Sequence, residues 1–144
     1  MATESTGTTE ITGSCLCGAV RYVITSEPMM AGHCHCRACQ KASGGAGASA
    51  IAVPEDAVTI TGTVKYYDNP TDSGGVSSKG FCPECGSRLM GKATGMPGLL
   101  TISAGSLDDP ALFKPTMNIF TASAQPWAPM DPDLAHFEGM PDMG

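Results

Sequence analysis

The sequence has few basic residues, few aromatic residues and no long hydrophobic run. Eight Lys and Arg residues stand against fourteen Asp and Glu, which gives a formal net charge of −6. This acidic balance gives no electrostatic support to a phosphate-backbone partner, so we expect no nucleic acid to bind. The longest apolar run, residues 46–53, is far shorter than the roughly 20 residues of a membrane span. The first ten residues lack the basic and apolar regions of a secretory signal, and we expect a cytoplasmic protein with no membrane partner.

Helix-forming segments are also scarce, whereas turn-forming residues are abundant. The 144 residues include eighteen Gly and eleven Pro, which indicates many turns and few long helices. Asp68-Asn69-Pro70 predicts a turn, and Asp109 followed by Pro110 predicts one helical turn, because Asp favours the N-cap and Pro the first helical position. Short apolar or alternating segments predict strands at residues 20–24, 48–53, 58–63, 64–67, 76–80, 88–92, 99–103 and 116–120.

These segments predict one all-β domain with little helix. The length fits a single core, and no linker or internal repeat divides the chain. We expect the domain to span residues 13–138. A flexible N-terminal tail at 1–12 and a C-terminal tail at 139–144 would flank it. Residues 126–141 contain four prolines and are expected to be extended or irregular.

Cysteine is the residue type that carries the most information here. The seven cysteines form three groups: Cys15-x-Cys17, Cys34-x-Cys36-x-x-Cys39 and Cys82-x-x-Cys85. An odd number excludes complete pairing within the chain, and cysteines one or two residues apart rarely form an unstrained disulfide. In a reducing compartment, clustered cysteines are more often metal ligands or catalytic groups. We therefore expect metal sites.

The first and last pairs predict a closed structural zinc site. Four thiolates from two tight turns make the tetrahedral shell that structural zinc prefers. The segment Phe81 to Gly86 has the form of a zinc knuckle, in which Pro83 and Gly86 shape the turn, and Gly18 follows the other pair in the same way. The ligands of this site are expected to be Cys15, Cys17, Cys82 and Cys85.

The remaining triplet, Cys34, Cys36 and Cys39, predicts a second zinc with an open position. Three protein ligands and a vacant fourth site are typical of catalytic zinc. His33 or His35 could instead complete a closed site, although a ligand wedged between two cysteine ligands is crowded. Without a metal, the triplet would be a redox-active Cys36-x-x-Cys39 pair or a set of unligated thiols. We expect two zinc ions per chain, the catalytic one being the more labile.

Several segments together resemble the glutathione-dependent formaldehyde-activating enzyme family. They are Gly13 to Tyr22, His35 to Gly44, the knuckle at 81–86, the run Ala104 to Pro110, and the motifs Asn118-Ile119-Phe120 and Ala124-Gln125-Pro126-Trp127. The resemblance implies a zinc-bound Mss4-like fold of folded sheets. It also implies the same division into four structural and three catalytic cysteines. Relatives often have His where this chain has Asn118, a departure that bears on proton transfer at the site.

The family's founding activity joins glutathione to formaldehyde and is classed with the carbon–sulfur lyases. We therefore hypothesise an enzyme that activates a glutathione-like thiol, a small aldehyde or both at the triplet zinc. The expected catalytic residues are Cys34, Cys36, Cys39 and His35, with His35 or His33 moving the proton. A zinc-hydroxide hydrolase and a non-catalytic zinc module that binds another protein are the competing hypotheses. An open ligand position favours either enzyme, and a position closed by histidine favours the module.

Four further side chains have two interpretations each. Arg37 and Lys41 lie beside the triplet in sequence and could hold a substrate carboxylate, or be solvated surface residues. Phe81 and Trp127 could line a pocket or pack in the core. His136 is expected at the surface. The sequence gives no oligomeric state.

Overall fold

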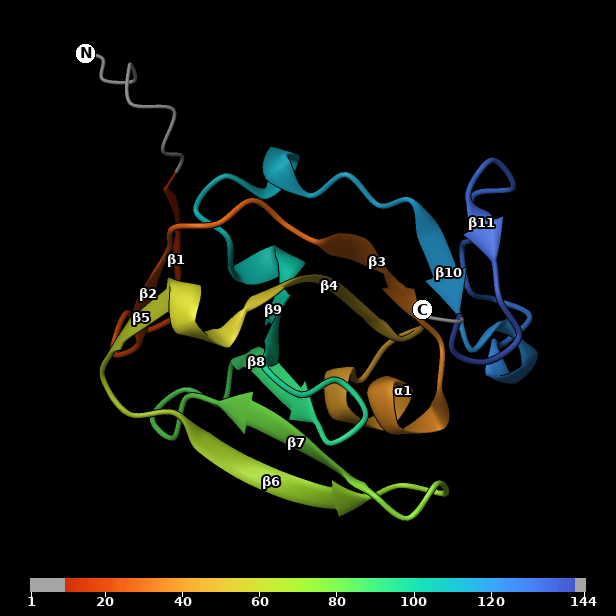
Figure 1. Cartoon of the computed structure of the whole chain (residues 1–144), viewed down its shortest axis with the longest axis horizontal. Coiled ribbons are helices and arrows are strands. Elements are labelled where there is room, and N and C mark those ends of the chain that lie inside the picture. The colour runs from red at the N-terminus through yellow and green to blue at the C-terminus, as the bar shows by residue number, and fades with distance from the viewer. Residues whose placement is uncertain (1–9, 142–144) are drawn as a thin grey trace.

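The computed structural model describes residues 10–141, which form two β-sheets and one short α-helix (Figure 1). The small sheet has the order β1-β2-β5, formed by β1 (Ile11–Ser14), β2 (Arg21–Ile24) and β5 (Val58–Thr61). The large sheet has the order β11-β10-β3-β4-β9-β8-β7-β6. Its strands are β3 (Met30–Cys34), β4 (Ala48–Pro54), β6 (Lys65–Pro70), β7 (Val76–Phe81), β8 (Arg88–Ala93), β9 (Leu99–Ser103), β10 (Met117–Ile119) and β11 (Ala135–His136).

The helices are short and lie between strands. The α-helix α1 (Arg37–Ser43) follows β3 directly, and four 3₁₀ turns occur at η2 (Glu55–Ala57), η3 (Ala104–Ser106), η4 (Pro110–Leu112) and η5 (Thr121–Ser123). Within residues 10–141, no helix is long and apolar enough to cross a membrane. The prediction of an all-β fold with little helix is confirmed. As expected, Asp109 caps η4 by accepting a hydrogen bond from the backbone N–H of Ala111.

The hydrophobic core lies between the two sheets. Each sheet contributes the side chains of one face, because successive residues of a strand point to opposite sides. The small sheet supplies Tyr22 and Ile24, which are 1% and 0% exposed. The large sheet supplies Ile51, Val53, Leu100, Ile102 and Met90, all at most 1% exposed. Burying a side chain of this size contributes roughly 1.5–3 kcal/mol, so this packing fixes which face of the large sheet is covered.

The other face of the large sheet is curved and carries small side chains. In Figure 1 the sheet curls, and α1 lies within the curve, where it contacts β4. We call this the concave face. The register places on it Cys34 opposite Ala48, Thr101 opposite both Ala52 and Gly91, and Lys79 opposite Gly91. The helix that carries the cysteine triplet packs on this face, against β4.

Most predicted strands are confirmed, but the turn at Asp68-Asn69-Pro70 is wrong. These three residues belong to β6 and pair with β7 as far as Val76. The chain turns at residues 71–75, where the backbone N–H of Thr71 donates to the carbonyl of Gly75. Pro70 is tolerated because β6 is an edge strand, where the missing N–H breaks no ladder bond.

The start of the domain also differs from the expectation. Ile11 and Thr12 were expected in the flexible tail at 1–12, yet they belong to β1 and pair with β2. The Ile11 side chain is 3% exposed and joins the core, which anchors the strand. Residues 1–9 of the predicted N-terminal tail lie outside the described residues. So do residues 142–144, which are half of the predicted C-terminal tail at 139–144.

Gly47 provides a test of how closely the chain packs where the triplet begins. A Cβ added at Gly47 would lie 2.1 Å from the carbonyl oxygen of Cys34 and 3.3 Å from the Cα of His35, both backbone atoms that cannot rotate away. Gly47→Ala is therefore expected to lower the free energy of unfolding by about 1–3 kcal/mol. The control is Gly95→Ala, where no atom lies within 4 Å of the added Cβ. Equal stability of both variants in urea unfolding would contradict the packing described here.

Candidate metal centres

The first cysteine cluster joins two turns that are far apart in sequence. The sulfur atoms of Cys15, Cys17, Cys82 and Cys85 all lie within 4.8 Å of one another. The Sγ–Sγ distances are 3.7 Å for Cys15–Cys17 and 3.8 Å for Cys17–Cys82. A tetrahedral metal with bonds of about 2.3 Å to sulfur separates its ligands by about 3.8 Å. The cluster therefore fits a zinc ion without rearrangement.

The two turns of this cluster are built alike. Gly18 and Gly86 adopt positive φ angles of 82° and 79°, a conformation that L side chains disfavour. Their N–H groups donate to the carbonyls of Cys15 and Cys82, which closes each turn. Within the turns, the N–H groups of Val20 and Glu84 donate to the sulfurs of Cys15 and Cys82, at 3.3 and 3.4 Å. Such donors favour the thiolate, the form of cysteine that ligates metal.

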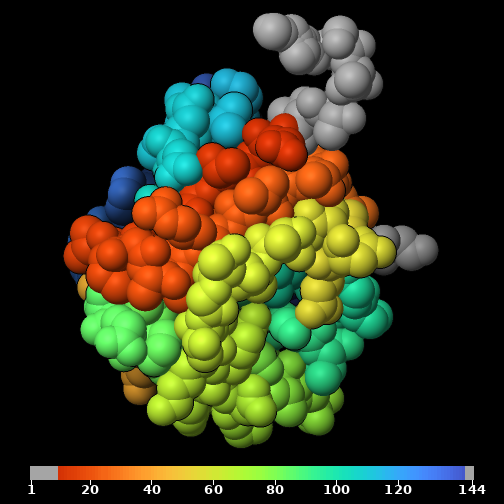
Figure 2. Space-filling view, turned by 90° about the vertical axis from the view of Figure 1, so that its left-hand side faces the viewer, coloured from red at the N-terminus to blue at the C-terminus, as the bar shows by residue number. Residues whose placement is uncertain are grey.

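Contacts outside the sulfurs hold the two turns together. Figure 2 shows the N-terminal segment, in red and orange, lying against the light green segment of the second turn. Ser87 accepts a hydrogen bond from the N–H of Leu16 at 3.0 Å, and its hydroxyl lies 3.1 Å from the Cys85 sulfur. The hydroxyl and the backbone of Ser87 lower the pKa of Cys85 to about 5. A lowered pKa favours the thiolate, the form of cysteine that ligates metal.

The second cluster is the triplet, in which Cys34 ends β3 and Cys36 and Cys39 begin α1. Cys36 is the N-cap of the helix, and its sulfur accepts a hydrogen bond from the N–H of Cys39 at 3.3 Å. This arrangement brings the three sulfurs within 4.8 Å of one another. Hydrogen bonds from the thiols of Cys34 and Cys39 lower the pKa of Cys36 to about 2. The hydrogen bond with Cys36 raises the pKa of Cys34.

The triplet has room for a fourth ligand. Among residues 10–141, no histidine, aspartate, glutamate or further cysteine places a ligand atom in this group. Its donor set is three sulfurs on one short segment, which suits a thiophilic metal such as zinc. The residues therefore fit a metal that is bound by three protein ligands and open at the fourth position.

The two histidines beside the triplet point away from it. His35 is 3% exposed, and its Nε2 lies 2.9 Å from Oδ1 of Asn118 on β10. The ring of His33 contacts the Ser49 hydroxyl through Nδ1 at 2.8 Å and packs edge-on against Phe113. Both rings lie on the face of the sheet opposite Cys34, because side chains alternate along β3 and its continuation. The alternation explains why neither histidine joins the sulfur cluster.

A buried polar network supports the turn that carries the triplet. Gln40, on α1, donates from Nε2 to the carbonyls of His35 at 2.7 Å and Ser123 at 3.0 Å. Its Oε1 accepts hydrogen bonds from Arg37 and Gln125. Within the described residues, Nδ1 of His35 and Nδ2 of Asn118 have no partner. The network fixes the backbone on both sides of Cys36.

The structure separates the other residues that the sequence singled out. The Arg37 guanidinium binds Gln40, and Lys41 is exposed. Trp127 is 64% exposed and Phe81 is half-buried at the end of β7. His136 is exposed, as expected, and its Nε2 lies 3.1 Å from the carbonyl of Asp131.

Two cations near the triplet were missed by the sequence reasoning. Burial lowers the pKa of Arg88, while the nearby thiolate charges of Cys39, Cys34 and Cys36 oppose that shift. The charge of Lys79 contributes to lowering the pKa of Cys36, after the two neighbouring thiols and the Cys39 N–H. Both cations lie at least 40 residues from the triplet in sequence, and only the strand register reveals their proximity.

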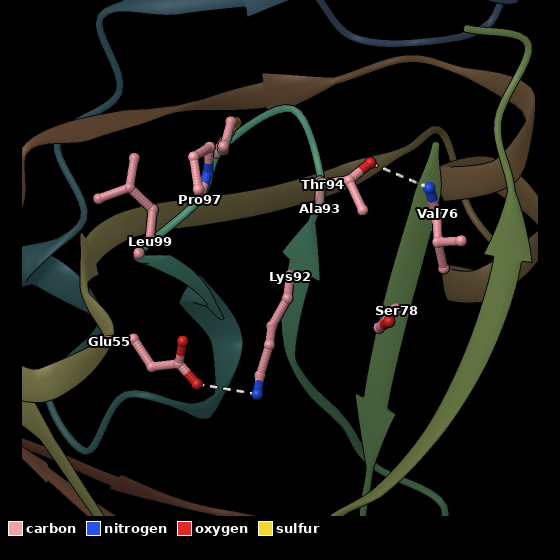
Figure 3. Close-up of a pocket in the computed structure, with 10 residues that line it drawn as sticks. Glu55, Val76, Ser78, Lys92, Ala93, Thr94, Pro97 and Leu99 are labelled. Carbon is pink, nitrogen blue, oxygen red and sulfur yellow. Dashed lines mark hydrogen bonds and ion pairs between the residues drawn. The ribbon is translucent and has the colours of Figure 1, made fainter. Parts of the chain in front are cut away.

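A hollow elsewhere on the molecule offers no comparable chemistry. It is lined by nine residues of the β7–β8 and β8–β9 regions and by Glu55 of η2, and none is a cysteine or histidine (Figure 3). The side chains of Lys92 and Glu55 form an ion pair of 2.8 Å within it, so its charges are already matched. The two cysteine clusters are therefore the chemically distinctive features of the described chain.

The chain is similar to known proteins in sequence and in fold. The family model described as glutathione-dependent formaldehyde-activating enzyme matches residues 10–123. A Halomonas elongata protein, provisionally named a glutathione-dependent formaldehyde-activating enzyme, is 34% identical over 82 residues. That match covers 54% of this chain and 52% of the relative, so the chain aligns with about half of the relative's length. A crystal structure of a Rhodobacter sphaeroides protein superposes with a TM-score of 0.55 at 20% identity, covering 67% of this chain and 87% of that one.

The two clusters are expected to differ in their effect on stability. The first closes a loop between Cys17 and Cys82, which are 65 residues apart, whereas the triplet lies within six residues of chain. Cys82→Ser is therefore expected to destabilise the zinc-loaded protein by more than about 3 kcal/mol, a fall in melting temperature of roughly 10 °C. The matched change Cys36→Ser should have a much smaller effect. Similar melting temperatures for the two variants would show that the first cluster does not hold the fold together.

Proposed function

The chain belongs to the glutathione-dependent formaldehyde-activating enzyme family, and from this premise we propose that it is a zinc enzyme that adds a thiol to a small aldehyde at the cysteine triplet. The reaction is of the carbon–sulfur lyase type when it runs in reverse. Glutathione and formaldehyde are the proposed substrates, because the family's description names both.

The observation that carries the proposal is the triplet without a fourth protein ligand among the described residues. Three sulfurs lie within 4.8 Å, and both neighbouring histidines lie on the opposite face of the sheet. A non-catalytic zinc module would be expected to close its shell with one of these histidines. The geometry therefore supports an enzyme over a purely structural role for this cluster.

The chemistry needs a nucleophilic sulfur and an electrophilic carbon held together. Zinc, when bound by these thiolates, acts as a Lewis acid and favours the thiolate form of an added thiol. In the addition, a carbon–sulfur bond forms, the π bond of the carbonyl breaks, and the thiol proton ends on the new hydroxyl. No other reagent is required, and the reverse reaction releases the same two molecules.

The chain's own residues contribute position and space. The N-cap contact of Cys36 and the Gln40 network fix the three sulfurs relative to one another. The concave face beside them carries the small side chains of Ala48, Ala50 and Ala52, and we propose that the substrate lies along this face. We propose that His35 acts through its backbone and its contact with Asn118, as a positioning residue for the turn between Cys34 and Cys36. Its buried ring is poorly placed to exchange a proton with a substrate on the concave face.

The proposed reaction also proceeds without the protein, so the measurement compares the rate with and without it. ¹³C-formaldehyde and glutathione exchange with their S-hydroxymethyl adduct. The rate of this exchange is measured by NMR, with and without zinc-loaded protein. Wild type is expected to accelerate the exchange. Cys36→Ser is expected to remove at least about 90% of the added rate, since mutations of catalytic groups commonly cost about 100-fold or more.

The control for this experiment is Lys41→Gln, which alters an exposed charge on the same helix and should leave the rate within about twofold. An unchanged rate in folded Cys36→Ser would contradict the proposal. Thiol-independent hydrolysis of an ester by the wild type, lost in Cys36→Ser, would instead identify a zinc-dependent hydrolase.

A further inference from the structure

Arg88 has an unusual environment for a charged side chain. It begins β8, and its Nη1 is buried with no hydrogen-bond partner among residues 10–141. Its remaining side-chain hydrogen bond runs from Nε to the carbonyl of Met90 at 3.4 Å. A buried guanidinium donor without an acceptor is costly and therefore needs an explanation.

The neighbourhood of Arg88 is shaped to hold the guanidinium. A Cβ added at Gly91 would lie 3.2 Å from Nη2 of Arg88 and 2.9 Å from Oγ1 of Thr101, so a side chain at Gly91 would crowd the guanidinium. Gly91 pairs with Lys79 on β7, which places Lys79 on the concave face. Arg88 and Lys79 therefore lie on the side of the sheet that carries Cys34.

Neither of these two cations is paired with a carboxylate among the described residues. Within the described residues, the single ion pair joins Lys92 to Glu55, and the Lys79 ammonium donates a hydrogen bond to the Ser77 hydroxyl at 3.4 Å. Three thiolates around a divalent metal carry a net charge of −1, whereas Arg88 and Lys79 together carry +2. A substrate thiolate at the fourth position would bring the total to zero, and both cations would still lack a carboxylate partner among the described residues.

We propose that Arg88 and Lys79 form an anion subsite that binds a carboxylate of the thiol substrate while the substrate sulfur reaches the triplet. The inference rests on the proposed function and narrows its substrate class to small thiols that carry a carboxylate. Arg88 supplies the planar donors that suit a carboxylate, and Lys79 supplies a second positive charge. Arg37 and Lys41, the cations adjacent to the triplet in sequence, are not part of this subsite.

The test compares two thiols that differ in one charge. Binding of 3-mercaptopropionate and of its methyl ester to the zinc-loaded protein is measured by calorimetry. Wild type is expected to bind the acid at least about tenfold more tightly than the ester. Arg88→Gln and Lys79→Gln should each reduce this ratio, and the double variant should bring it close to one. The matched control is Lys114→Gln, an exposed lysine outside the concave face, which should keep the wild-type ratio.

The ratio separates a carboxylate subsite from a general electrostatic role. If Arg88 only balances the thiolate charges, its loss weakens the acid and the ester equally, and the proposal is overturned. Lys79→Gln gives the same test if Arg88→Gln does not fold, because the Lys79 side chain is only half-buried. Retention of the wild-type ratio in folded Lys79→Gln and Arg88→Gln would likewise overturn the subsite.

Propionate, which has the carboxylate but no sulfur, distinguishes failure of the subsite from failure of the proposed function. In one outcome, propionate binds to wild type but not to Arg88→Gln, and 3-mercaptopropionate binds no more tightly than propionate. This outcome supports the subsite and contradicts thiol activation. Equal binding of the acid and the ester to wild type, with no binding of propionate, overturns the subsite and leaves the proposed function standing.

Discussion

The close approach of four sulfurs from two distant turns is the constraint on which the rest of the structure depends. Cys15 and Cys17 follow β1, and Cys82 and Cys85 follow β7, so their cluster ties the small sheet to the large one. Each turn is closed by a glycine with positive φ and supplies N–H donors to sulfur. A metal bound there would hold the small sheet over the apolar face of the large sheet and protect the core between them.

Covering one face of the large sheet decides what the other face can do. Along β4 and β9, residues such as Ile51 and Ile102 point into the core, while Ala52 and Thr101 point to the concave side. The same alternation along β3 sends His33 to one face and Cys34 to the other. The triplet is thereby separated from the histidines beside it in sequence and placed with two cations that are distant in sequence.

Much of this arrangement was predictable from local sequence, because its signals lie within a few residues. The grouping of cysteines, with Gly18 and Gly86 at the turns, predicted both clusters, and alternating segments such as 20–24 and 99–103 predicted their strands. The signals for α1 and β3 were weaker. The helix is capped by Cys36 instead of the usual Ser, Thr, Asp or Asn, and Met30–Cys34 has no apolar alternation. Arg88 and Lys79 could not be assigned from the sequence, because their place depends on the register of β7, β8 and β9.

We propose that the chain binds two metal ions in different roles, one in a closed shell of four sulfurs and one in an open shell of three. The most direct measurement is zinc per chain by elemental analysis, on purified wild type and on Cys36→Ser, before and after incubation with glutathione. We expect about two zinc ions in wild type and about one in the folded variant, with glutathione changing only the second zinc. One zinc in both proteins, unaffected by glutathione, would contradict it.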